Sequence, residues 1–63
     1  MKLYRMNDLV QVLDISRWSV YRLIDAGKFP KPLRLGNRTP RWPADEVDQW
    51  LQERHRERFE VRP

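Results

Sequence analysis

Side chains that can bind a nucleic acid are concentrated in one short stretch, Ser16-Arg17-Trp18-Ser19-Val20-Tyr21-Arg22. An arginine guanidinium binds phosphate oxygens or the edge of a guanine through two parallel hydrogen bonds. Serine and tyrosine hydroxyls donate hydrogen bonds to phosphate, and a tryptophan ring can pack on a thymine methyl group or a sugar. These residue types therefore suit contact with both the backbone and the bases of DNA.

A second group of cationic side chains surrounds a turn that contains Gly36. Its members are Lys31, Arg34, Arg38 and Arg41. We expect Arg38, near the tip of the turn, to enter the minor groove or grip the backbone, and Arg34 and Arg41 to contact phosphates with Lys31 at the base. The alternative is that these charges only keep an exposed strand edge soluble.

The charge balance of the chain favours a polyanionic partner. Its 63 residues include 13 Lys and Arg against 9 Asp and Glu, which gives a net charge of +4. A chain of this length is expected to form one domain over residues 1–63, too small for a deep catalytic cavity. With no cysteine and one histidine, His55, we expect no metal, no cofactor and no enzymatic activity.

No apolar run approaches the roughly 20 residues needed to span a bilayer, and the N-terminus has no signal-peptide pattern. We therefore expect a cytoplasmic, nucleoid-associated protein that binds double-stranded DNA, with neither a membrane nor a small-molecule substrate as a partner.

Two short helices must position the first stretch. Apolar side chains spaced three and four apart predict a helix over Met6–Leu13, with Asn7 as its N-cap. A second helix is predicted over Arg17–Ala26, because Ser16 is a suitable N-cap and Gly27 a suitable left-handed C-cap. The short connection, with Asp14 in its tight turn, has the spacing of a helix-turn-helix, whose second helix faces the major groove.

The helical wheel of the second helix separates a buried from an exposed face. The expected buried stripe consists of Val20, Leu23 and Ile24, and the outward pair consists of Trp18 and Arg22, flanked by Ser19, Tyr21 and Asp25. Three positions remain open for Trp18: on DNA, against the N-terminal segment, or in a protein interface. Arg22 binds DNA or pairs with Asp14 or Asp25, and Tyr21 either packs at the core edge or binds phosphate.

A small hairpin, or wing, is predicted next. Pro30 and Pro32 favour an extended connection, Leu33 to Leu35 alternate, and Pro40 to Trp42 return toward the core. We expect Leu35 and Trp42 to pack inward, and Pro40 to place the return strand at an edge.

The last predicted helix begins near Pro43 or Ala44, with its buried face formed by Val47, Trp50 and Leu51. Beyond Leu51 the same stripe becomes charged, so we expect the helix to leave the core, with a charged tail from about residue 55 and fraying after about Arg56. That segment is either a solvated helix end or a contact with a neighbouring protomer. His55 is expected at the surface.

Four separated blocks of the sequence resemble AlpA-type regulators of phages and genomic islands and the related excisionases. The blocks are Ser16 to Ile24, Gly27 to Pro32, Leu35-Gly36 with Arg41-Trp42, and Glu46 to Leu51. The resemblance covers nearly the whole chain. It implies a MerR-like winged helix-turn-helix, mainly α, with three helices and a two-stranded wing.

The resemblance also implies a function, namely sequence-specific binding of double-stranded DNA and transcriptional regulation of a phage or integrated mobile element. The DNA-contacting positions of the family fall here on Arg17, Trp18, Ser19, Arg22 and Arg38, although Trp18 replaces the small polar residue more usual in the family.

One alternative function is that of an excisionase that bends attachment-site DNA and acts with an integrase or recombinase. The other is a protein-interaction module on the same scaffold. Because a single module of this kind buries only about 600–1,000 Å² on DNA, self-association on repeated sites is expected.

Overall fold

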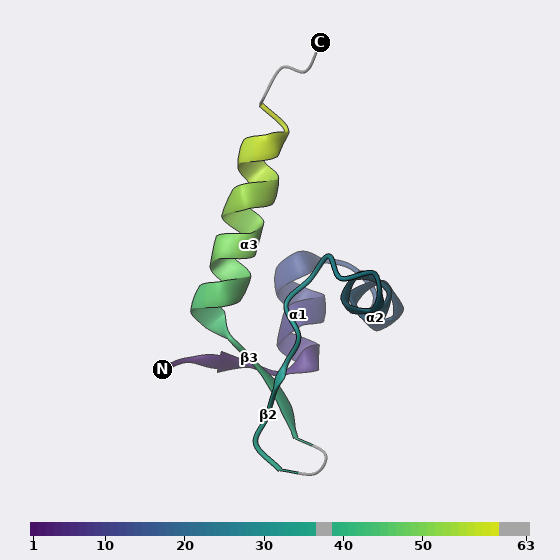
Figure 1. The fold of residues 1–63 in the computed structure, drawn as a ribbon, viewed down its shortest axis with the longest axis vertical. Helices are drawn as coiled ribbons and strands as arrows, with labels where there is room; N and C mark the ends of the chain where they lie inside the picture. Colours follow the sequence, from purple (N-terminus) through teal and green to yellow (C-terminus); the bar gives the residue numbers. More distant parts are fainter. Residues whose placement is uncertain (37–38, 60–63) are drawn as a thin grey trace.

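The computed structural model describes residues 1–36 and 39–59. Within these residues the chain forms three helices and three short strands (Figure 1). In chain order they are β1 (Leu3–Tyr4), α1 (Met6–Leu13), α2 (Arg17–Asp25), β2 (Leu33–Arg34), β3 (Pro40–Pro43) and α3 (Ala44–Glu57). The prediction of a mainly α fold with a small hairpin is confirmed, and β1 is an addition to it.

The start of α1 differs from the prediction. The N-cap is Arg5, not Asn7, and the Asp8 carboxylate accepts a hydrogen bond from the Arg5 backbone N–H at 2.8 Å. An acidic residue in the first turn thus satisfies a free backbone donor and also suits the helix dipole. This leaves the Asn7 side chain free for a contact with α2.

The ends of α2 follow the predicted capping. The Ser16 hydroxyl accepts a hydrogen bond from the Ser19 backbone N–H at 3.2 Å. Ala26, predicted as the last helical residue, is the C-cap, and Gly27 has a φ of +73°. The backbone N–H groups of Gly27 and Lys28 donate to Ile24 and Leu23 at 3.0 and 2.8 Å, which is the Schellman arrangement.

The three strands form one antiparallel sheet in the order β1-β3-β2. The predicted edge position of the Pro40 strand is therefore wrong, because β3 lies in the centre. Leu35 donates to Thr39, and Ala44 donates to Lys2. Since hydrogen-bonded and non-bonded pairs alternate in antiparallel ladders, Pro40 and Pro43 both occupy non-bonded positions. The ring of Pro40 therefore faces the side of β1, at a level beyond the end of that strand at Tyr4. The ring of Pro43 faces the side of β2, at a level before the start of that strand at Leu33.

The core lies between the helices and the sheet. Its buried side chains are Leu9, Val20, Phe29, Trp42 and Val47. Trp42 is 1% exposed, as predicted, but Leu35 is 60% exposed, so its predicted inward packing is wrong. In the observed register Leu35 pairs with Thr39 and so shares a sheet face with Arg41, opposite the face of Trp42.

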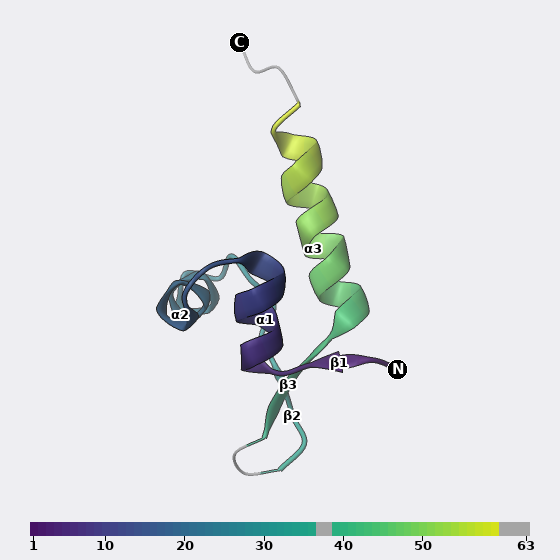
Figure 2. The same ribbon diagram turned by 180° about the vertical axis from the view of Figure 1, so that it is seen from behind.

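Helix α3 begins at Ala44, as predicted, with Val47 buried and Trp50 and Leu51 partly buried. Its C-terminal part extends away from the other elements, in the direction opposite to the β2–β3 hairpin (Figures 1 and 2).

The N-terminal part of α3 is linked to β1, because the Tyr4 hydroxyl donates a hydrogen bond to the Asp48 carboxylate at 3.4 Å. Partial burial and the Asp48 carboxylate raise the pKa of Tyr4 above its ordinary value. Within the described residues no helix is long and apolar enough to cross a membrane.

Candidate nucleic-acid interface

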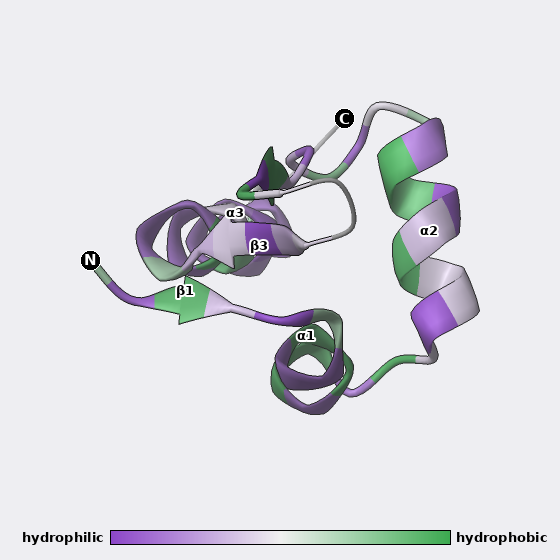
Figure 3. Cartoon of the chain, turned by 90° about the horizontal axis from the view of Figure 1, so that it is seen from below, coloured by the Kyte–Doolittle hydropathy of each residue, from purple (hydrophilic) through white to green (hydrophobic). Residues whose placement is uncertain are grey.

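The exposed face of α2 carries two aromatic rings and an arginine. Trp18 is 71% exposed and Tyr21 45% exposed, whereas Val20 on the opposite face is completely buried. The hydrophobic side of α2 faces the rest of the molecule, and its hydrophilic side faces outward (Figure 3). The predicted outward position of Trp18 is confirmed, and packing against the N-terminal segment is not observed.

The two aromatic rings touch each other. The Trp18 and Tyr21 ring centroids are 6.3 Å apart, with an interplanar angle of 60°, which is an edge-to-face contact. Each ring therefore restricts the orientation of the other, while both stay accessible from outside.

The first turn of α2 is tied to α1 and to its own cap. The Arg17 guanidinium donates to the Asn7 side-chain oxygen at 2.9 Å. The Ser16 and Ser19 hydroxyls are 3.1 Å apart and share a hydrogen bond. Arg17 and Ser19 are thus both held in place by neighbours, and Arg17 keeps most of its five N–H donors for another partner.

Arg22 lies one turn after Trp18 on the same exposed face. It forms no ion pair within residues 1–36 and 39–59, so pairing with Asp14 or Asp25 is not observed there. Its charge is available to an external anion.

A cleft of about 220 Å³ separates α2 from the β2–β3 hairpin. Helix α2 contributes Tyr21, Ile24 and Asp25, and the other wall is formed by Pro32, Arg34, Pro40 and Trp42. The cleft brings Tyr21 and Arg34, which are 13 residues apart in the sequence, to the two sides of one hollow. These two predicted site residues therefore lie on one continuous surface.

The remaining predicted site residues are more dispersed. Arg41 pairs across the strands with Leu33, on the face of the sheet away from the cleft, and its guanidinium donates to the Pro40 carbonyl at 2.7 Å. Lys31 is exposed in the connection before β2. Arg38 lies outside the described residues. Within those residues, no group of three or more potential metal ligands occurs.

Sequence reasoning missed Asn7 as a positioning residue. Its contact with Arg17 joins residues ten positions apart, in two different helices. The residue pattern around Asn7 is that of a helix N-cap, and it gives no sign of a contact with Arg17.

The two helices with their short connection and the small sheet are consistent with a small helix-turn-helix-like domain. The chain matches the family described as Prophage CP4-57 regulatory protein (AlpA) over residues 2–55. It therefore belongs to the AlpA family of prophage regulatory proteins, which confirms the resemblance found in the sequence.

A relative from Enterobacteria phage P4, named Uncharacterized protein ORF88, is 32% identical over 47 residues. The matched region covers 75% of this chain and 53% of the phage protein, so the chain spans about half the length of that relative. No solved structure matches the chain at a significant level.

Proposed function

We propose that this AlpA-family chain is a sequence-specific regulator that binds double-stranded DNA, with α2 in the major groove and the β2–β3 hairpin alongside as a wing. The observation that carries the proposal is the common surface formed by the exposed face of α2 and the hairpin wall of the cleft, which presents Trp18, Tyr21, Arg22 and Arg34. Membership of a family of prophage regulatory proteins supports the same function.

The residues divide into two roles in this proposal. Trp18, Ser19 and Arg22 face the base edges, because they lie in the first turns of the recognition helix. Tyr21 and five basic residues fix the register on the phosphates, which carry most of the salt-dependent affinity. These cations are Arg17, Lys31, Arg34, Arg38 and Arg41.

DNA binding by the domain is tested by measuring its affinity for duplex DNA as a function of salt. If the domain neutralises about four phosphates, its affinity falls about a hundredfold between about 50 and about 200 mM salt. Arg22→Ala is expected to weaken binding to a selected duplex by on the order of tenfold. Arg56→Ala on α3 is the matched control, since it removes the same exposed charge from another element, and it is expected to have a much smaller effect.

Two results would contradict the proposal: an affinity for duplex DNA that stays flat as salt rises, or an Arg22→Ala variant that binds as tightly as the wild type. The first would favour a protein-interaction module.

The regulatory role has its own test. Transcript levels of genes next to a selected binding site are expected to change on expression of the wild type and to stay constant on expression of Arg22→Ala. An altered excision frequency with constant transcript levels would point to an excisionase instead.

A further inference from the structure

We propose that Trp18 is a specificity-determining residue that selects thymine through the C5 methyl group in the major groove. This inference rests on the proposed DNA-binding function and deepens it, because it assigns a base to one side chain.

Trp18 differs from the two other tryptophans of the chain. Trp42 and Trp50 donate their indole N–H groups to the backbone carbonyls of Pro30 and Lys28, at 2.9 and 2.6 Å. Trp18 is 71% exposed and donates to no other described residue. Two indoles thus stabilise the fold, while the third presents its apolar ring and its donor to the outside.

The position of Trp18 suits an apolar base contact. It is the second residue of α2, in the turn that a recognition helix directs toward the bases. In the major groove, thymine presents a methyl group beside the O4 acceptor, a combination that no other base offers. An indole carries an apolar ring and one N–H donor, so it matches both groups.

The contact with Tyr21 prepares the ring for this role. Because the two rings meet edge to face at 6.3 Å, the Trp18 side chain has fewer free rotamers to lose on binding DNA. Tyr21 itself also borders the cleft toward the hairpin, so the aromatic pair joins the base-reading turn to that cleft.

The spacing between Trp18 and Arg22 adds a geometric constraint. Four residues advance an α-helix by about 6 Å, and base pairs stack about 3.4 Å apart. If Arg22 binds a guanine edge, the selected thymine is expected within about two base pairs of that guanine.

The test begins with duplexes selected by the wild-type protein from a random-sequence pool. Each thymine of the recovered motif is then replaced by deoxyuridine, which lacks only the methyl group. One replacement is expected to weaken binding about fourfold, the loss that corresponds to one buried methyl. In Trp18→Ala the thymine and deoxyuridine duplexes are expected to bind equally.

Phe59→Ala is the matched control, since Phe59 is an aromatic residue 66% exposed beyond the end of α3. This variant is expected to keep the full preference for thymine. Circular dichroism melts should show both variants folded, because neither side chain belongs to the core.

The inference is overturned if wild-type binding is salt-dependent yet no deoxyuridine replacement weakens it, or if Trp18→Ala keeps the preference. The proposed function survives either result. Loss of cooperative DNA binding in Trp18→Ala, without any effect of the thymine methyl group, would likewise overturn the inference. That result would assign Trp18 to a contact between copies of the protein. Absence of salt-dependent binding would overturn both proposals.

Discussion

Two residues with a positive φ determine where the short helices end. Asp14, with a φ of 55°, stops α1, and Gly27, with a φ of 73°, stops α2. Aspartate tolerates the left-handed region better than most residues, and glycine adopts it without a steric penalty. The direction of α2 relative to α1, and hence the orientation of Trp18, depends on the first of these turns.

Gly27→Ala tests the second turn. A Cβ at this position would meet no atom within 4 Å, so the cost comes from the backbone alone. We expect a loss of about 1–2 kcal/mol in the free energy of unfolding, measured by urea denaturation. Gly36→Ala is the control, because its added Cβ would lie 3.5 Å from the Thr39 hydroxyl oxygen, an ordinary contact. Equal losses in the two variants would contradict the assigned role of the left-handed cap.

At the residue scale, the sequence predicted features that depend on near neighbours. The Ser16 and Gly27 caps and the outward position of Trp18 follow from helix geometry and backbone preference alone. The pairing of Arg17 with Asn7 could not be predicted, because it depends on how two helices are placed across the turn.

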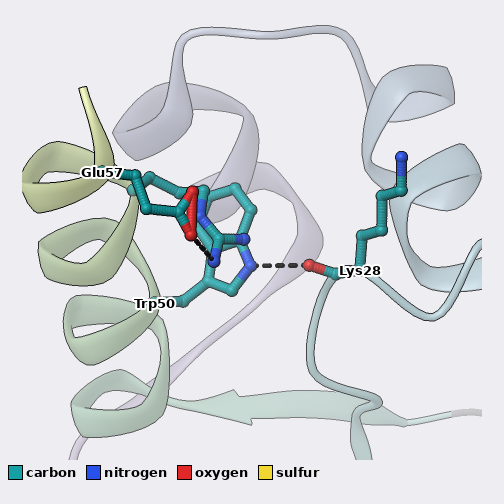
Figure 4. Close-up of polar contacts among 4 residues, drawn as sticks. Lys28, Trp50 and Glu57 are labelled. Carbon is teal, nitrogen blue, oxygen red and sulfur yellow. Dashed lines mark hydrogen bonds and ion pairs between the residues drawn. The ribbon is translucent and has the colours of Figure 1, made fainter. Parts of the chain in front are cut away.

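Two indoles hold the connection between α2 and β2 in place. Trp50 of α3 donates to Lys28 (Figure 4), and Trp42 of β3 donates to Pro30. Phe29 lies between Lys28 and Pro30 in the chain and is 4% exposed. The centroid of its ring is 4.9 Å from the centroid of the Trp50 ring. The hairpin wall of the cleft therefore owes its position beside α2 to these contacts.

We expect Trp42→Phe to destabilise the fold more than Trp50→Phe. Both variants lose one hydrogen bond to a backbone carbonyl, at a typical net cost of about 0.5–1.5 kcal/mol each. Trp42 is buried and Trp50 only partly so, which makes the packing loss larger for Trp42→Phe. Thermal unfolding should show the larger decrease in Tm for Trp42→Phe. The reverse order would mean that α3, not β3, is the main anchor of the connection.

At the element scale, the three helices were predictable because their apolar periodicity extends over two or more turns. Strand β1 was not, since its two residues, Leu3 and Tyr4, are too few to show alternation. Its absence from the prediction also explains the error at Pro40. Without β1, the proline suggested an edge strand, whereas in the structure it occupies a position where β1 does not reach.

Across the whole molecule, the surface of α2 and the hairpin is separated from the distal part of α3. Figure 1 shows the hairpin and the C-terminal part of α3 pointing in opposite directions. On α3, Arg54 forms an ion pair with Glu57 at 2.8 Å and also lies 5.2 Å from the Trp50 ring. The Arg54 and Glu57 side chains are 40% and 50% exposed, so solvent screens this pair.

Glu57→Gln is therefore expected to change the free energy of unfolding by less than about 0.5 kcal/mol, as measured by chemical denaturation. A loss above about 1 kcal/mol would show that the distal turn of α3 contributes to the stability of the core.

The central claim is that α2 and the hairpin form one DNA-binding surface, and nuclear magnetic resonance tests it most directly. The ¹⁵N-labelled chain is titrated with a selected duplex while the backbone amide shifts are followed. The largest shifts are predicted in the first two turns of α2, from Arg17 to Arg22, and at Arg34, with little change at α3 from Gln52 to Glu57. Shifts concentrated on α3, or confined to α2 with none at the hairpin, would contradict the account.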